Sequence, residues 1–308
     1  VSVKAFGDEL AENLAELVKE LREKQYRPLP VKRVEIPKPG GGVRKLGIPS
    51  VRDRVVQQTL LDTLTPIFDP DFHPSSYGYR PGKSSHQAIE KASMFMRKYE
   101  LEWVVDMDLS KCFDTLRHDF LLAQIRRKVA DGSILSLIRL FLESGVMTET
   151  GYEETEEGSP QGGVISPLLA NIYLDYFDQW SMEKGYRIVR YADDILIFAS
   201  SRKGAERRLK QAEKVLEEEM GLTVNREKTH ITRLQDRRRH PLLAVRTDPS
   251  GRLRGELQER LHRIPGPVHR VALEELGQGE EEGDGRRLHR LPDGPGAQDR
   301  HGHEEVHV

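Results

Sequence analysis

The chain has 308 residues and a formal net charge of −2, with 37% hydrophobic, 32% charged and only 6% aromatic residues. This length suits two ordinary domains or one larger domain with a poorly packed extension, and the polar composition favours the second arrangement. The single cysteine, Cys112, excludes an internal disulfide and a cysteine-rich zinc site. The sequence also has neither a signal-peptide pattern nor an apolar run of about 18 residues. We therefore expect a cytoplasmic protein with no membrane partner.

The first hundred residues predict helices around one hairpin. Apolar residues at helical spacing predict a helix over 8–24, with Asp8 placed to cap it. Residues 31–49 alternate apolar and basic side chains about a Pro-Gly-Gly-Gly turn, which predicts a β-hairpin with a positive face. Two more helices are expected, one over 51–68 and one from residue 84 or 85 to about 98.

The hairpin belongs to a basic segment. Between residues 31 and 55, seven Lys and Arg residues stand against two acidic ones, in a chain whose total charge is nearly balanced. Such a local excess of cations is what phosphate binding needs. A solvated charged face is the ordinary alternative, and it stays open.

The middle of the chain predicts strands that alternate with helices. Residues 101–109 form an apolar, β-branched run that ends in acidic residues, so a buried strand should carry a carboxylate near its C-terminal end. Residues 186–200 predict a hairpin with two aspartates at its tip. Helices are expected at 118–129, 133–144, 166–180 and 203–220, and a short strand pair at 222–231. This order indicates an α+β domain with a mixed or antiparallel sheet.

From about residue 237 the composition changes. The last 72 residues contain no Lys, Asn, Phe, Tyr, Trp, Met or Cys, whereas seven of the eleven histidines lie there. A segment without large apolar residues does not close a core, so we expect residues 237–308 to be a disordered tail. A natural basic tail would have this composition, and so would a GC-rich gene translated in a shifted frame. We favour the frameshift.

Three aspartates in apolar strands are the strongest sign of chemistry. Asp108 follows Trp-Val-Val-Asp-Met, and Asp193 and Asp194 lie inside Arg-Tyr-Ala-Asp-Asp-Ile-Leu. A carboxylate in apolar surroundings is costly to ionise unless a positive charge lies beside it. Adjacent strands would gather the three around two Mg²⁺ ions, one activating an attacking hydroxyl and one stabilising a leaving pyrophosphate. Turn formation and capping stay open as ordinary roles.

Other motifs accompany the tetrapeptide Tyr-Ala-Asp-Asp at 191–194. They are IPKPGGGVRKLGIPSVRDRVVQQ (36–58), SYGYRPGKSSHQAI (76–89), DMDLSKCFDT (106–115), GSPQGGVISPLLANIYLD (158–175) and GLTVNREKT (221–229). In type and order they resemble the successive motifs of the reverse transcriptases encoded by group II introns, over roughly residues 3–236. The resemblance implies right-hand polymerase fingers at about 1–100 and a palm at about 101–236, whose mixed or antiparallel sheet packs on helices.

The resemblance also implies the metal ligands Asp108, Asp193 and Asp194. Asp108 is preferred to Asp106 because the family has an aromatic residue five positions after the ligand, and here that residue is Phe113. A ring beneath the sugar of the incoming nucleotide would collide with a 2′-hydroxyl and so favour deoxynucleotides. Ordinary core packing is the alternative for Phe113.

Five further residues resemble substrate-binding positions of the family. Lys38 and Arg44 resemble residues that clamp the triphosphate, where a cation neutralises the charge that develops on pyrophosphate. Lys45 is an open alternative for this role. Gln161 and Gly162 resemble the loop that leads into the helix under the template base. Lys228 matches a basic position that could reach substrate phosphate or the catalytic carboxylates, and a plain surface lysine is its alternative.

The implied function is RNA-directed DNA polymerisation in support of group II intron mobility and splicing. Its partners would be an RNA template, a DNA primer and deoxynucleoside triphosphates, with two Mg²⁺ ions as cofactor. A maturase that only binds intron RNA is a second hypothesis, and an inactive remnant is a third, because no thumb or maturase region is recognisable after residue 236. The residues do not indicate an oligomeric state.

Overall fold

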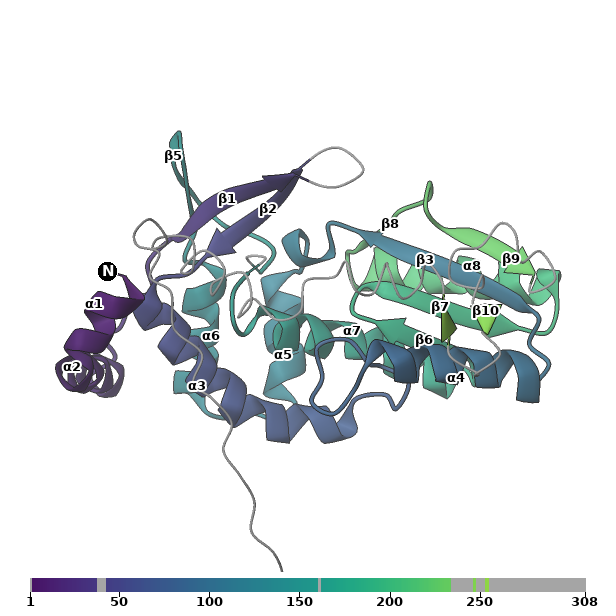
Figure 1. Cartoon of the computed structure of the whole chain (residues 1–308), viewed down its shortest axis with the longest axis horizontal. Helices are drawn as coiled ribbons and strands as arrows, with labels where there is room; N and C mark the ends of the chain where they lie inside the picture. The colour runs from purple at the N-terminus through teal and green to yellow at the C-terminus, as the bar shows by residue number, and fades with distance from the viewer. Residues whose placement is uncertain (1, 38–42, 160–161, 234–245, 248–252, 255–308) are drawn as a thin grey trace, which may run out of the picture. The chain divides into compact units, whose positions relative to one another are not determined.

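A computed structural model describes residues 2–37, 43–159, 162–233, 246–247 and 253–254 (Figure 1). Contacts divide the chain into two units, 1–270 and 271–308, and every described residue lies in the first. The tail predicted at 237–308 lies outside the described residues, except for the short antiparallel pair β10 (Arg246–Thr247) and β11 (Leu253–Arg254). Within the described residues, no helix is long and apolar enough to cross a membrane.

The helices follow the predicted order. They are α1 (Val3–Asp8), α2 (Leu10–Arg22), α3 (Val51–Phe68), α4 (Ser85–Lys98), α5 (His118–Arg126), α6 (Gly132–Leu142), α7 (Ser166–Glu183) and α8 (Arg202–Lys214). Short 3₁₀ turns lie at η1 (Asp69–Asp71) and η2 (Cys112–Asp114), and a π-helical turn, η3 (Val215–Glu219), extends α8. The start of α4 has a complete capping box between Ser84 and Gln87, which fixes the beginning of that helix.

The helix predicted over 8–24 is confirmed as α2, but the predicted cap was wrong, because Asp8 ends a separate short helix, α1. The backbone leaves the helical region at Glu9, with φ −118° and ψ 36°, and Asp8 is the last residue of α1. Glu9 precedes α2 without a side-chain capping bond. Ser2 makes the capping bond of this region, because its hydroxyl accepts from the amide of Ala5 at 3.1 Å at the start of α1.

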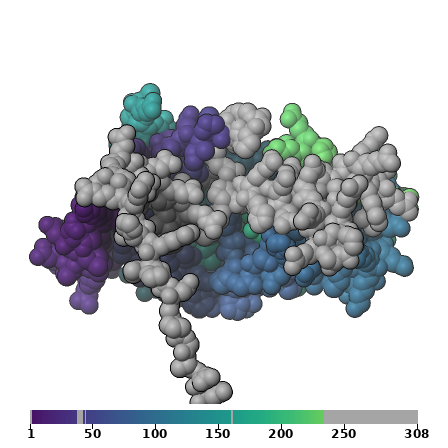
Figure 2. All heavy atoms as spheres, in the orientation of Figure 1, coloured from purple at the N-terminus to yellow at the C-terminus, as the bar shows by residue number. Residues whose placement is uncertain are grey.

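The first sheet contains the basic hairpin. Its strands are β1 (Val31–Pro37), β2 (Val43–Ile48), β4 (Val146–Thr148) and β5 (Gly151–Glu153), in the order β2-β1-β4-β5. The β1–β2 pair is antiparallel, as predicted, and β1 pairs with β4 in parallel. The space-filling view shows this hairpin and β5 at the surface (Figure 2). Strands far apart in sequence therefore complete one sheet.

Buried Asp53 ties this hairpin to α3. Its carboxylate accepts from the hydroxyl of Tyr26 at 2.5 Å, from the amide of Leu29 at 3.1 Å and from the hydroxyl of Ser50 at 2.7 Å. The Ser50 hydroxyl in turn accepts from the Asp53 amide and caps α3. A buried carboxylate needs such partners, and these fix the connection from α2 into β1.

The second sheet carries the aspartates. Its strands are β3 (Trp103–Ser110), β6 (Arg187–Tyr191), β7 (Asp194–Ala199), β8 (Thr223–Val224) and β9 (His230–Arg233), in the order β6-β7-β3-β8 with β9 also on β3. A strand pair was predicted at 222–231, but β8 and β9 each pair with β3. The prediction missed this because the pairing spans more than a hundred residues of sequence, beyond what local pattern specifies.

Helices cover both faces of the second sheet. Val104 packs in one cluster with Ala92 and Phe95 of α4, whereas Val105 belongs to the larger core that includes α7 and α8. Figure 1 shows α4 running along one face of β6 and β7 with α8 on the other. Burial on both faces explains the nearly continuous apolar runs in β3 and β7, and the predicted α+β class is confirmed.

Candidate active site

Two strands and a turn hold the predicted aspartates. Asp108 lies near the C-terminal end of β3, and its partner across the antiparallel β3–β7 pair is Asp194. Asp193 lies in the two-residue turn between β6 and β7. Only Asp193 is at the tip of the hairpin, because Asp194 already pairs with Tyr191. The Cα atoms of opposed residues in such a pair lie about 4.5–5.5 Å apart, and Asp193 directly precedes Asp194, so the backbones of all three aspartates lie at one end of the sheet.

Asp108 forms an ion pair with a lysine from a distant part of the chain. Its Oδ2 atom accepts from the ammonium of Lys228 at 3.0 Å and from the amide nitrogen of the Asn225 side chain at 3.1 Å. The backbone amide of Asn225 donates to the Asp108 carbonyl at 2.8 Å. The ammonium of Lys228 therefore contacts a predicted metal ligand, although the Lys228 side chain is 57% exposed.

The donor chemistry of this site fits Mg²⁺. Carboxylate oxygens are the hard ligands that Mg²⁺ prefers, and the Lys228 contact shows that Asp108 accepts a cation. Among the described residues, no three His, Cys, Asp or Glu side chains are grouped closely enough to hold a metal ion. The three aspartates therefore offer the ligand type that Mg²⁺ prefers and a shared backbone position, but their side chains are not gathered into a metal-binding group in this structure.

Phe113 and Asp193 line the same small hollow, together with Tyr79, Cys112, Asn171 and Ala192. The rings of Phe113 and Tyr79 meet edge to face, with centroids 6.3 Å apart. Burial, and after it the charge of Asp193, raises the pKa of the Cys112 thiol. A raised pKa favours the thiol over the thiolate, which is the stronger nucleophile.

Of the other four predicted substrate-binding residues, the structure describes two, Arg44 and Gly162. Lys38 and Gln161 are outside the described residues, and Arg44 is described only by its backbone, opposite Ile36 in the β1–β2 pair. Gly162 has φ +110°, and a Cβ atom there would lie 2.6 Å from the carbonyl oxygen of Gly47. Packing therefore also explains a glycine at position 162, because the absence of a side chain lets this loop contact β2.

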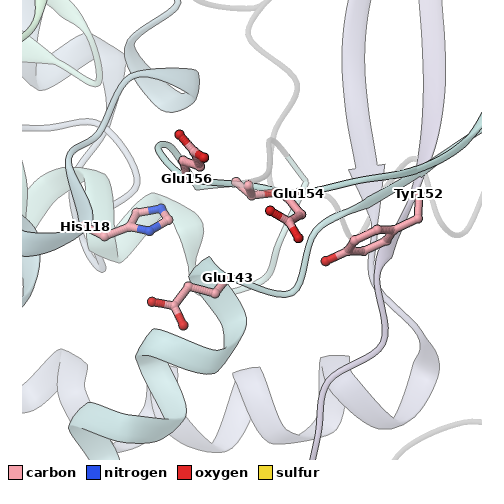
Figure 3. Close-up of a pocket in the computed structure, with 6 residues that line it drawn as sticks. His118, Glu143, Tyr152, Glu154 and Glu156 are labelled. Carbon is pink, nitrogen blue, oxygen red and sulfur yellow. The ribbon is translucent and has the colours of Figure 1, made fainter.

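A larger hollow lies away from these residues. It is lined by His118, Glu143, Tyr152, Glu154, Thr155 and Glu156 (Figure 3). The Nε2 atom of His118 is 2.7 Å from the carbonyl oxygen of Gly158, so this imidazole holds the loop after β5. Three glutamates repel phosphate, and none of the predicted site residues lines the hollow.

Sequence comparison agrees with the geometry. The family described as "Reverse transcriptase (RNA-dependent DNA polymerase)" matches residues 36–260, which is more than half of the chain. The chain belongs to the reverse transcriptase family. Protein YkfC of Escherichia coli K12 is 35% identical over 264 residues, covering 74% of this chain and 69% of YkfC.

The relatives of this reverse transcriptase include a group II intron-encoded protein and other intron proteins, which confirms the resemblance. Group II intron-encoded protein LtrA of Lactococcus lactis is 34% identical over 189 residues, covering 59% of this chain and 31% of LtrA. A putative COX1/OXI3 intron 1 protein of Saccharomyces cerevisiae is 30% identical over 274 residues, covering 71% of this chain and 32% of that protein. The reverse transcriptase chain thus spans about a third of these two intron proteins.

Solved structures share the fold of the reverse transcriptase. Telomerase from Candida albicans, in complex with a fragment of telomeric RNA, superposes with a TM-score of 0.53 at 16% identity, covering 68% of this chain and 44% of that one. At this identity the likeness concerns the fold alone. It agrees with the sheet and helices that carry the three aspartates.

Sequence reasoning missed three buried polar residues behind the turn. Arg190 donates to Asp178 and Asn171, two residues of α7, and all three are almost fully buried. A charged residue inside the apolar run Arg-Ile-Val-Arg-Tyr was the available signal, because an arginine is rarely buried without a partner. Asp178 and Asn171 were also visible as polar residues, because they lie among the buried apolar residues of α7.

Proposed function

We propose that this chain is an RNA-directed DNA polymerase of the group II intron type, which adds deoxynucleotides to a DNA primer on an RNA template. The observation that carries the proposal is the opposition of Asp108 and Asp194 across β3 and β7, with Asp193 in the connecting turn. Fingers at about 1–100, a palm at about 101–236 and a cytoplasmic location belong to the same proposal.

Asp108, Asp193 and Asp194 would hold two Mg²⁺ ions. When bound, these ions lower the pKa of the attacking 3′-hydroxyl and neutralise the charge on the leaving pyrophosphate. The chain's own residues orient the substrates. Lys228, now 3.0 Å from Asp108, is exposed enough to turn toward a substrate phosphate, and Lys38, Arg44, Gln161 and Gly162 remain the proposed contacts to nucleotide and template.

The Phe113 ring is proposed to select the sugar. We expect Phe113→Val to admit ribonucleotides, because the smaller side chain removes the surface that a 2′-hydroxyl would strike. The measurement is the ratio of dNTP to rNTP incorporation efficiency. Phe120→Val is the matched control, since Phe120 of α5 packs against Tyr173 and Tyr176 of α7. An unchanged ratio in Phe113→Val would mean that the ring only packs.

The basic hairpin is proposed to contact template phosphates. Lys32 and Lys45 are exposed on β1 and β2, so RNA binding should weaken steeply as salt rises. We expect Lys45→Gln to reduce the slope of log K against log salt by about 0.7, the value for one phosphate contact on a single strand. Lys203→Gln, at an exposed position of α8, should leave the slope unchanged. A flat salt response of the unmodified chain would count against this surface.

A maturase role is the second candidate. Nuclear intron maturase 4 of Arabidopsis thaliana is 34% identical over 134 residues, covering 43% of this chain and 16% of that protein. A maturase predicts intron RNA binding that is independent of Asp193, with no primer extension by the unmodified chain.

The proposed polymerase is tested by extension of a labelled DNA primer on an RNA template. We expect extension with Mg²⁺ and none with a chelator. A folded chain that binds the primer–template and extends nothing would instead support the maturase or an inactive remnant.

A further inference from the structure

A fully buried ion pair lies directly behind the Ala192–Asp193 turn. The guanidinium of Arg190 donates to Asp178 from Nε, at 3.0 and 2.9 Å, and from Nη2, at 2.6 Å. Both side chains are 0% exposed. Removing two charges from water is costly, and apolar side chains of similar volume are often no less stable. Core packing alone therefore does not explain why this ion pair is present.

The remaining arm of Arg190 reaches the turn. Its Nη1 atom donates to the carbonyl oxygen of Ala192 at 2.9 Å and to the side-chain oxygen of Asn171 at 2.9 Å. Ala192 has φ +56°, a left-handed conformation that is unfavourable for any residue with a Cβ atom. Arg190 thus stabilises the strained backbone at Ala192, the residue that directly precedes Asp193.

The loop before α4 supports the same turn. The amide of Arg190 donates to Ser75, and its carbonyl accepts from the amide of Tyr77, both at 2.9 Å. Asn171 donates to the carbonyl of Gly78 at 2.9 Å. Because Asn171 bonds to both the loop and the guanidinium, the loop, α7 and the turn form one connected network.

We propose that Arg190, oriented by Asp178 and Asn171, is a positioning residue that fixes the Ala192–Asp193 turn and so directs the Asp193 carboxylate toward a divalent cation. This inference rests on the proposed function, because it concerns the same metal ligands. The planar fork of arginine is required, since it grips Asp178 on one edge and the turn carbonyl with the other arm. A lysine keeps the charge next to Asp178 but cannot span both partners.

The test compares Arg190→Lys with the unmodified full chain. Binding of Mn²⁺ is measured by electron paramagnetic resonance with an RNA template, a dideoxy-terminated DNA primer and the next dNTP, so that no turnover occurs. Hydrogen exchange at the amides of 191–194 is measured without metal. We expect faster exchange at the turn and a half-saturating Mn²⁺ concentration raised by about 10-fold, the usual size of effect for a residue that orients a metal ligand.

A matched control separates positioning from general destabilisation. Ile138→Val removes one buried methylene from α6, which packs on α5, and it should change neither Mn²⁺ binding nor exchange at the turn. Should Arg190→Lys fail to fold, Asn171→Ser replaces it, because this change leaves the Arg190–Asp178 pair intact. Its half-saturating Mn²⁺ concentration should also rise.

The outcomes are distinct. Weaker Mn²⁺ binding and faster turn exchange in Arg190→Lys, with the control unchanged, support the inference. Normal binding in the unmodified chain together with unaltered binding in the folded variant would overturn the inference and leave the proposed function standing. Absence of Mn²⁺ binding in the unmodified chain would overturn the proposed function and the inference with it.

Discussion

Asp193→Asn is expected to abolish DNA synthesis while the fold is retained. The amide keeps the shape of the carboxylate but removes the charge that would bind Mg²⁺. Since metal ions contribute several kcal/mol to stabilising transition-state charge, we expect the single-turnover rate to fall by roughly 10³-fold. The thermal unfolding midpoint, measured in parallel, should change little, because Asp193 lies in a turn and not within a strand.

The control for this change is Asp119→Asn. Asp119 undergoes the same chemical substitution on the surface of α5, where its side chain is 71% exposed and pairs with partly exposed Arg117. Exposed ion pairs contribute little, so the rate and the midpoint should both be normal. A wild-type rate in Asp193→Asn would remove that residue from the catalytic site.

Gly78→Ala is expected to damage both stability and activity. A Cβ atom at this position would lie 2.2 Å from the amide nitrogen of Ala192 and 2.9 Å from its Cα atom. Both are backbone atoms, which do not move aside as a flexible side chain does. We expect the free energy of unfolding to fall by about 1–3 kcal/mol, measured by denaturant titration.

The activity loss should exceed what this destabilisation explains. Because the new methyl group presses on the residue next to Asp193, the turn must shift, and displacements of about 1 Å at a catalytic site reduce rates by about 10²-fold. The rate is measured well below the unfolding midpoint. Gly132→Ala is the control, since a Cβ atom there meets nothing within 4 Å at the start of α6. Normal stability and rate in Gly78→Ala would show that residue 78 does not press on the turn.

Local sequence pattern was sufficient for most elements. The basic hairpin, α3, α4 and β3 lie within a residue or two of their predicted bounds, because each depends on periodicity, on turn residues or on a capping box within its own segment. The pattern of apolar strands ending in carboxylates also predicted that Asp108, Asp193 and Asp194 come together, and the structure places their backbones at one end of the sheet. Their role as metal ligands remains a prediction.

Contacts between distant segments could not be predicted in this way. Lys228 and Asp108 are 120 residues apart, and β9 finds β3 through a pairing that no short segment encodes. Arg190 was visible as a charge in an apolar strand, but its partners on α7 depend on how that helix crosses the sheet. These long-range contacts depend on tertiary packing, which cannot be read from local sequence patterns.

The most direct test of RNA-directed polymerisation is to measure which dNTP the chain adds opposite each template base. The full chain, with Mg²⁺ and a DNA primer, would be given four RNA templates that differ only in the first templating base, and each dNTP would be supplied separately. We predict that only the complementary deoxynucleotide is added on each template, and that Asp193→Asn adds none. Failure of the folded, RNA-bound chain to add any nucleotide, or addition that ignores the template base, would contradict the proposed function.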